Sequence, residues 1–379
     1  MIKRVYPAND KVLNFKFVQN DVDFIVEEQP IKFSSYGNFL ILKIKKQNCD
    51  TWELIDRLSK FLGVYSSDIG YAGLKDKRAT TIQYISIPKK YQKEIKNFKS
   101  KKIEILDTFL HNKKLNIGDL KGNRFKINLH ELELEELFHI EKLLKFVSKN
   151  GFPNYFGYQR FGKDVKENLE KAKDLLFGDA IIKDRKVAKM LLSAYQSTFF
   201  NAWLVERLKL DNSGFKLLDG DIFYDIKNEK LFTPKSINEK IIEDFKEKLI
   251  TPTGLLPGRD VFKAKDDALK IEQKYDDSEI TEKGYRREAV VFPEILSSKY
   301  DKLNKSCSLD FILPKGSYAT VLIELLANRN FGWNIRLKES FFSNKNSGFI
   351  HYSFMEELYN LNQNRFYYLL LLIFFHYQN

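Results

Sequence analysis

The sequence contains little cysteine, and its metal-ligating side chains do not cluster. Cys49 and Cys307 are the two cysteines, and neither has a histidine or a second cysteine nearby in the sequence. This spacing excludes a disulfide framework and a zinc-binding signature. The five histidines are scattered along the chain. We therefore expect no metal ion, and a reducing cytoplasm is the simplest setting.

Long hydrophobic runs are also missing. No stretch reaches the roughly 18 apolar residues that a membrane-spanning helix requires, and residues 1–17 lack the apolar centre of a signal peptide. The nearest approach is residues 366–376, FYYLLLLIFFH, which is too short to span a bilayer and is more typical of a buried helix or strand. We expect no membrane partner.

Several catalytic signatures are absent as well. The chain has no GxxxxGK[ST] phosphate loop, no GxGxxG after a strand-like run and no HExxH. These absences disfavour nucleotide hydrolysis, dinucleotide binding and metallopeptidase chemistry.

Positive charge, in contrast, is in excess. Sixty-three lysines and arginines face 51 acidic residues, which gives a formal net charge of +12. This balance favours a polyanionic partner such as nucleic acid. The alternative is compositional drift in a chain rich in Lys, Asn, Ile, Phe and Tyr, so the placement of the charge has to decide.

Helical and strand-like segments alternate along the chain, which indicates a mixed α and β fold. Asp50 resembles a helix N-cap, and Gly122-Asn123 predicts a turn before the strand-like FKINL. The next helix ends at Gly151, and its expected apolar stripe consists of Leu134, Leu137, Phe138, Leu144 and Val147. The character changes near Lys163, and the strand-like residues 308–326 indicate a return to the first domain.

The stretch AGLKDKRATTIQ places one acid, Asp76, among three cations just before a confident strand. Lys75, Lys77 and Arg78 should favour the ionised carboxylate, because nearby opposite charge lowers a carboxyl pKa, and they could also hold phosphate. An ionised carboxylate beside cations suits attack on a sugar carbon. Taken by itself, the spacing favours the alternative of a charged turn whose ions are merely solvated.

The stretch NYFGYQRFG, residues 154–162, interleaves aromatic rings with small residues, an amide and an arginine. Aromatic rings stack on unpaired bases, side-chain amides hydrogen-bond to base edges, and an arginine guanidinium binds phosphate. This loop could therefore hold a nucleotide that has left its stack. A core turn whose rings simply pack is the alternative. Residues 111–126 and Arg286 with Arg287 are basic clusters that could extend a phosphate-binding surface.

Taken together, the motifs resemble the TruD family of tRNA pseudouridine synthases. The matching blocks occur in family order over most of the chain, and they are residues 23–30 (DFIVEEQP), 72–83, 113–125, 154–162, 193–208 and 313–326. The resemblance implies an α+β fold in which a pseudouridine-synthase core, with a mixed and largely antiparallel sheet flanked by helices, is interrupted by an inserted α/β TRUD domain. We expect the core at residues 1–165 and 296–379 and the insertion at residues 166–295.

The same resemblance implies a cofactor-free isomerase that converts uridine to pseudouridine in tRNA, usually at position 13. Asp76 matches the catalytic aspartate, which acts either as a nucleophile at C1′ or as a base at C2′ of a flipped-out uridine. Phe156 matches the residue that stacks on the base, Asn154 its neighbouring amide and Phe24 an N-terminal aromatic. A family lysine upstream of that aromatic has Lys16 as its nearest counterpart, offset by an apparent insertion.

Arg160, Lys75, Lys77 and Arg78 complete the expected substrate-binding set, and tRNA is the expected partner of a monomer. The rival hypothesis is a non-catalytic protein that binds or folds RNA through the same basic, aromatic surface. The acid favours the enzyme, because a loop that only binds phosphate loses affinity to a central carboxylate. The residues that follow the last family block have no functional interpretation.

Overall fold

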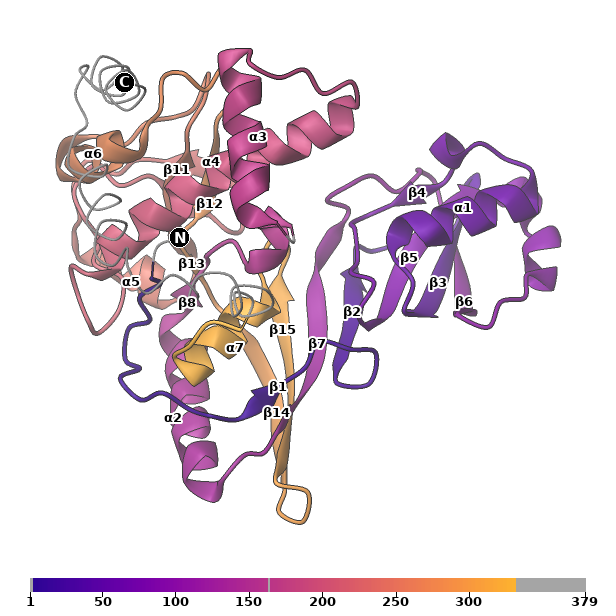
Figure 1. The fold of residues 1–379 in the computed structure, drawn as a ribbon, viewed down its shortest axis with the longest axis horizontal. Coiled ribbons are helices and arrows are strands. Elements are labelled where there is room, and N and C mark those ends of the chain that lie inside the picture. Colours follow the sequence, from indigo (N-terminus) through magenta and orange to yellow (C-terminus); the bar gives the residue numbers. More distant parts are fainter. Residues whose placement is uncertain (1–2, 163, 332–379) are drawn as a thin grey trace, which may run out of the picture. The chain divides into compact units, whose positions relative to one another are not determined.

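The structure is a computed structural model that describes residues 3–162 and 164–331 (Figure 1). The apolar stretch at residues 366–376 and the rest of the C-terminal extension lie outside these described residues. In the part that is described, no helix is long and apolar enough to cross a membrane.

A nine-stranded mixed sheet organises the described chain. Its strands follow one another in the order β14-β15-β7-β2-β5-β3-β6, with β1 added on β7 and β4 on β5. Within this sheet the described pairings are antiparallel except for β2 with β5. The strands are β1 Lys16–Phe17, β2 Phe24–Pro30, β3 Phe39–Gln47, β4 Gly70–Tyr71, β5 Thr80–Pro88, β6 Ile103–His111, β7 Leu120–His130, β14 Glu294–Asp301 and β15 Ser306–Pro314. The predicted α+β class with a mixed, largely antiparallel sheet is confirmed.

Strand alternation explains one core. Cys307, Leu309, Phe311 and Leu313 are buried on β15, while the residues between them are partly accessible, which is the period of two expected for a sheet with one covered face. The Phe311 ring stacks on Phe125 of β7, with centroids 5.6 Å apart. Helices α2 (Leu134–Asn150) and α7 (Ala319–Ala327) supply buried residues to the same core.

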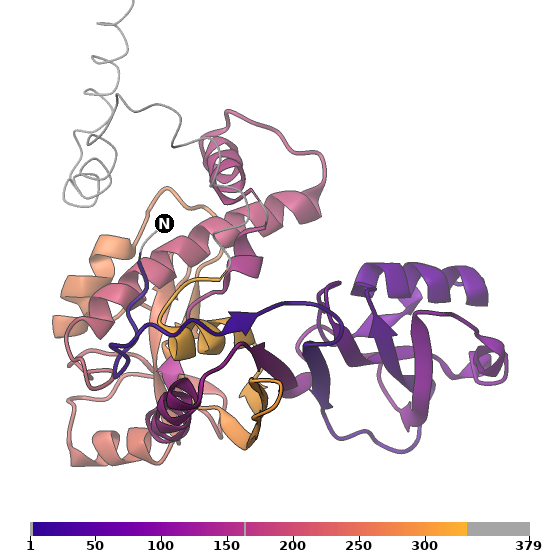
Figure 2. The same ribbon diagram turned by 60° about the horizontal axis from the view of Figure 1, so that its bottom comes forward.

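Helix α1 (Thr51–Leu62) covers the strands β3, β5 and β6 in both views (Figures 1 and 2). As predicted, Asp50 caps it, because its side chain accepts a hydrogen bond from the Glu53 backbone at 2.8 Å. Gly63 ends the helix at φ 65°, a left-handed conformation that favours glycine. Leu54 and Leu58 of α1 pack with the buried residues of β3 and β5.

A second sheet of four strands has the order β10-β9-β11-β12. Its strands are β9 Phe223–Asp225, β10 Lys230–Phe232, β11 Ile250–Leu256 and β12 Tyr285–Glu288, and its helices are α3 Val165–Phe177, α4 Arg185–Leu208, α5 Glu239–Lys246 and α6 Asp266–Glu272. A separate pair joins β8 (Phe152–Pro153) to β13 (Val290–Val291). Single 3-10 turns occupy Ser66–Asp68, Lys89–Tyr91, Glu94–Asn97, Tyr158–Phe161 and Gln273–Tyr275.

Three local predictions are wrong. Gly122 and Asn123 form no turn but lie inside β7, where Gly122 pairs with Pro314 on one side and Gln29 on the other. Residues 319–326 are helical in α7 rather than strand-like. In α2 two members of the predicted stripe, Leu134 and Phe138, are 49% and 62% exposed, because the helix turns Ile140 and Leu143 toward the core instead.

Candidate active site

Asp76 lies on the loop between β4 and β5, and hydrogen bonds to three other segments fix this loop. The Lys75 backbone N–H donates to the Thr51 hydroxyl at 2.9 Å, and that hydroxyl donates to Gln83 on β5 at 3.2 Å. The Gly118 backbone N–H donates to the Ala72 carbonyl at 2.8 Å. The loop is therefore attached to the first turn of α1, to the sheet and to the chain before β7.

The three cations of this loop have different surroundings. Lys75 forms a buried ion pair with Glu28 of β2 at 2.8 Å. Lys77 is largely exposed and pairs with Glu53 at 3.3 Å. Arg78 is exposed, and its positive charge acts to lower the pKa of the Tyr158 hydroxyl. The sequence did not distinguish these roles: Lys75 contributes to the fold, while Lys77 and Arg78 remain accessible to a ligand.

A glutamine connects the acid with the second motif. Gln19, in the segment before β2, donates from Nε2 to Asp76 Oδ2 at 3.5 Å and accepts from the Tyr158 hydroxyl at 2.7 Å. Tyr158 opens the 3-10 turn of the NYFGYQRFG motif. Two motifs that are far apart in the sequence therefore meet at one side chain, which sequence reasoning missed because an isolated glutamine carries no signal.

Asp76 is exposed at its surface, yet the surrounding protein removes enough water to raise the pKa of its carboxyl above the ordinary value. Lys46, the Gln19 hydrogen bond and Lys75 act in the opposite direction. The sequence predicted a lowered pKa from Lys75, Lys77 and Arg78, and this net direction is wrong, because desolvation outweighs the cations. A carboxylate that is poorly hydrated is a stronger base and nucleophile than one in bulk water.

Lys46 on β3 is a second residue that sequence reasoning missed. Its side chain is fully buried, and Nζ donates to the Cys49 carbonyl at 2.5 Å. Burial lowers the pKa of Lys46 to about 8, although the nearby charges of Asp50 and Asp76 oppose that change. The signal was present in the strand FLILKIKKQ, where alternation places Lys46 on the same inward face as Leu42 and Ile44.

The second motif is held from both sides of its backbone. The amide of Asn201, on α4, accepts from the Phe156 N–H at 2.8 Å and donates to the Phe156 carbonyl at 3.1 Å. Arg287 donates from Nε to the Asn154 carbonyl at 2.9 Å and from Nη2 to Asn154 Oδ1 at 2.7 Å. The other end of the Asn154 amide donates to the Glu288 carbonyl at 3.0 Å, so one of its two N–H groups is committed.

The Phe156 ring is largely covered. It is 7% exposed, and the Arg287 guanidinium lies 3.9 Å from its centroid. Phe200 and Tyr318 meet the ring edge to face at 5.6 and 6.2 Å. Arg160 donates from Nε to the Ser197 hydroxyl at 3.1 Å, which attaches the motif to α4. Loss of hydration lowers the pKa of Arg287 to about 10, so the group stays a cation at neutral pH.

Two other expected residues have different surroundings. Phe24 begins β2, is 3% exposed and packs in the core, with its centroid 6.0 Å from those of Phe17 and Phe125. Lys16 is exposed on β1 and pairs with Glu131 at 3.5 Å. Within the described residues, neither forms a hydrogen bond or an ion pair with Asp76, whereas Tyr158 is joined to it through Gln19.

The basic clusters are partly engaged inside the protein. Arg286 forms a buried ion pair with Glu272 at 2.6 Å, and Arg124 binds Asp310 with two hydrogen bonds of 2.8 and 2.7 Å. The expectation that Arg286 extends a phosphate-binding surface is therefore wrong, because its side chain is 3% exposed. Over residues 3–162 and 164–331, no three His, Cys, Asp or Glu side chains group closely enough to hold a metal ion.

Comparison with known proteins identifies the family. The sequence profile described as "tRNA pseudouridine synthase D (TruD)" matches residues 3–181 and 180–325. Two proteins named tRNA pseudouridine synthase D are similar to this chain. The protein of Wolinella succinogenes is 40% identical over 86% of this chain and 99% of its own length. The protein of Nitratiruptor sp. is 38% identical over 86% of this chain and 98% of its own length. A crystal structure titled as the putative enzyme of Methanosarcina mazei shares the fold, with a TM-score of 0.63 at 24% identity over 86% of this chain and 97% of its own.

The class that these findings define is the pseudouridine synthases, which are isomerases. Because the profile covers most of the chain, and several relatives exceed 30% identity over nearly their full length, the chain belongs to the TruD family of tRNA pseudouridine synthases. The predicted family and enzyme class are confirmed.

Proposed function

We propose that this protein isomerises uridine to pseudouridine at position 13 of tRNA, with Asp76 as the catalytic carboxylate. The observation that carries the proposal is the position of Asp76 on a fixed loop, accessible yet poorly hydrated, and joined through Gln19 to Tyr158 of the aromatic motif. The family membership supports the same reaction.

The reaction breaks the bond from N1 to C1′, turns the uracil and forms a bond from C5 to C1′. C5 loses a proton and N1 gains one, so the RNA mass does not change. Asp76 acts on the ribose, either by attack at C1′ or by removal of a proton from C2′. Both routes require the uridine to leave its stack, because neither sugar atom is accessible to a side chain within the helical stack.

The proposed substrate-binding residues are Phe24, Asn154, Phe156, Arg160, Lys75, Lys77 and Arg78. Asn154 is 2% exposed, and we assign its second amide N–H to a uracil carbonyl, since the first donates to the Glu288 carbonyl. Phe156 offers the uracil the small part of its ring that Arg287 and its aromatic neighbours leave uncovered. Lys77 and Arg78 suit the phosphates beside the target nucleotide, whereas Lys75 acts through its ion pair with Glu28.

The proposal keeps the predicted domains, with a core at residues 1–165 and 296–379 and an insertion at residues 166–295. In support, the four strands of the second sheet lie between residues 223 and 288, while β14 and β15 pair within the large sheet. We also retain a monomeric enzyme that works in the cytoplasm without a metal ion.

The test combines product analysis with RNA binding. The parent protein and Asp76→Ala are incubated with tRNA transcript in the presence of EDTA, and digested RNA is analysed for pseudouridine by mass spectrometry after chemical labelling. The parent should form one pseudouridine per tRNA at position 13, and Asp76→Ala should form none while it binds the tRNA with similar affinity. Full activity of Asp76→Ala contradicts the assignment of Asp76.

Two rival functions give different outcomes in the same assay. A non-catalytic RNA-binding protein leaves uridine unchanged in the parent and in Asp76→Ala alike. An RNA N-glycosidase releases free uracil, so the RNA loses mass rather than keeping it.

A further inference from the structure

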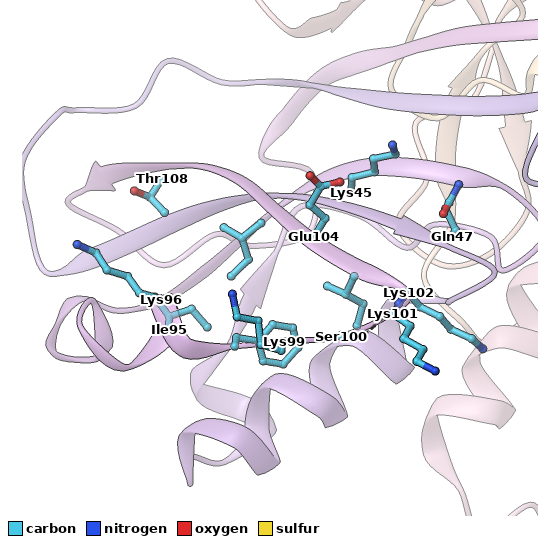
Figure 3. Close-up of a pocket in the computed structure, with 13 residues that line it drawn as sticks. Lys45, Gln47, Ile95, Lys96, Lys99, Ser100, Lys101, Lys102, Glu104 and Thr108 are labelled. Carbon is cyan, nitrogen blue, oxygen red and sulfur yellow. Dashed lines mark hydrogen bonds between the residues drawn. The ribbon is translucent and has the colours of Figure 1, made fainter.

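A basic groove lies at the end of the large sheet where β6 is the last strand. Its volume is about 590 Å³. It is lined by the residues shown in Figure 3, which include Lys45 on β3, Lys96, Lys99, Lys101 and Lys102 before β6, and Glu104 on β6. We call these five lysines and the surface between them the lysine groove.

The charge of the lysine groove is largely unpaired. Its lining contains one carboxylate, that of Glu104, and five ammonium groups. Within the part of the chain that the structure describes, Lys102 is the one of these five that forms an ion pair, to Glu53 at 4.0 Å. Concentrated cations without internal counterions attract an anionic ligand, because binding releases the counterions that the ligand carries.

The lysine groove is continuous with the active-site loop through Glu53. This carboxylate contacts Arg57 at 3.0 Å, Lys77 at 3.3 Å and Lys102 at 4.0 Å. One negative charge is thus shared by three positive ones. Lys77 directly follows Asp76, so positive charge extends from the loop, past the first turn of α1, to the rim of the groove.

Lysines beside an edge strand have another use, which is to prevent pairing with a second chain. Their distribution here does not fit that use well. Lys96, Lys99, Lys101 and Lys102 precede β6, while the exposed charges on the strand itself include the acidic residues Glu104 and Asp107. These four lysines therefore belong to the segment that precedes β6 and not to the edge strand itself.

We propose that the lysine groove binds the sugar-phosphate backbone of the tRNA at a position outside the target uridine. This inference rests on the proposed function for the nature of the ligand, and on the charge, the groove and its continuity with Lys77 for the site. Phosphate contacts orient a nucleic acid without reading its sequence. The groove should accordingly control affinity and KM, and leave the chemical step at Asp76 unchanged.

The experiment compares two variants that lose the same charge. The groove variant carries Lys96→Gln, Lys99→Gln, Lys101→Gln and Lys102→Gln. The control variant carries Lys227→Gln, Lys230→Gln, Lys235→Gln and Lys302→Gln, which are exposed lysines outside both the groove and the Asp76 loop. Binding of tRNA transcript is measured over a series of salt concentrations, and kcat and KM are measured on the same transcript.

The groove variant should bind at least about 10-fold more weakly at low salt, and the slope of log K against log salt should decrease by about 0.7 to 0.9 for each phosphate that the groove no longer neutralises. Its KM should rise with kcat unchanged, and the control should stay within about 2-fold of the parent. Equal losses of affinity in the two variants, or a loss confined to kcat, overturn the proposal. Aggregation of the groove variant with unchanged tRNA affinity also overturns it and supports edge protection.

A second variant keeps the test independent of folding. The variant Lys99→Glu with Lys101→Glu reverses two charges at exposed positions. For each residue changed, it should weaken tRNA binding more than the groove variant does. Its unfolding midpoint should equal that of the parent. A parent that binds tRNA through the groove but forms no pseudouridine contradicts the proposed function alone. A parent that forms pseudouridine while the charge-reversed variant binds normally contradicts the groove alone.

Discussion

Replacement of Lys46 by methionine should stabilise the protein at neutral pH. Burial lowers the pKa of Lys46 from 10.5 to about 8, and at about 1.36 kcal/mol per pKa unit this corresponds to about 3 kcal/mol of unfavourable free energy in the folded state. Loss of the hydrogen bond to the Cys49 carbonyl offsets about 1 kcal/mol of that gain. We expect Lys46→Met to raise the free energy of unfolding by about 2 kcal/mol.

The effect has a definite pH dependence. Because the pKa of Lys46 is lower in the folded state than in the unfolded chain, the cost of the buried ammonium is complete below pH 8 and disappears toward pH 10.5. The advantage of Lys46→Met over the parent should therefore narrow as the pH rises from about 8 to about 10. Urea unfolding of both proteins across this range, with neutral pH as the reference, measures the difference. A variant that is less stable at neutral pH, or a difference that does not change with pH, refutes the reasoning.

The same substitution should change catalysis. Lys46 is the strongest of the charges that favour the ionised form of Asp76, so its removal should raise the pKa of Asp76 further. The acidic limb of the kcat profile should move to higher pH. Lys43→Met is the matched control, because Lys43 lies on the opposite face of β3 from Lys46 and outside the lysine groove. An unchanged acidic limb in Lys46→Met shows that this lysine does not act on Asp76.

Two further substitutions test the surroundings of the site and the large sheet. Arg287→Lys loses the planar guanidinium over Phe156 and the paired hydrogen bonds to Asn154. The kcat/KM for tRNA should therefore fall by about 10- to 100-fold, which corresponds to about 1.4 to 2.7 kcal/mol. An unchanged kcat/KM contradicts a positioning role for Arg287. Gly122→Ala should lower the free energy of unfolding by about 1 to 3 kcal/mol, because the added Cβ would lie 2.3 Å from the Leu313 carbonyl oxygen. In the control, Gly214→Ala, the added Cβ meets no atom within 4 Å, so the free energy of unfolding should not change.

Local signals predicted the elements whose causes are local. The Asp50 cap and the Gly151 stop depend on hydrogen bonds and backbone angles within one turn, and the structure has both. The Gly122-Asn123 turn failed because the decisive interactions are not local: β2 and β15 pair on either side of this segment, and only glycine leaves room for the Leu313 carbonyl. A strong turn signal was overridden by two strand partners.

The chain by itself determined the acid, the motif order and the family, because these depend on residue types at fixed spacing. Only the tertiary structure decided what surrounds the acid. Lys46 acts on Asp76 through its charge and Gln19 through a hydrogen bond, each from a different segment, and desolvation of the carboxyl raises a pKa that the adjacent cations alone would lower. Burial and electrostatic environment are properties of the assembled chain, since they depend on atoms that are distant in sequence. For the same reason the three cations of the loop, which look equivalent in the sequence, have different roles. Lys75 forms a buried ion pair, whereas Lys77 and Arg78 are accessible.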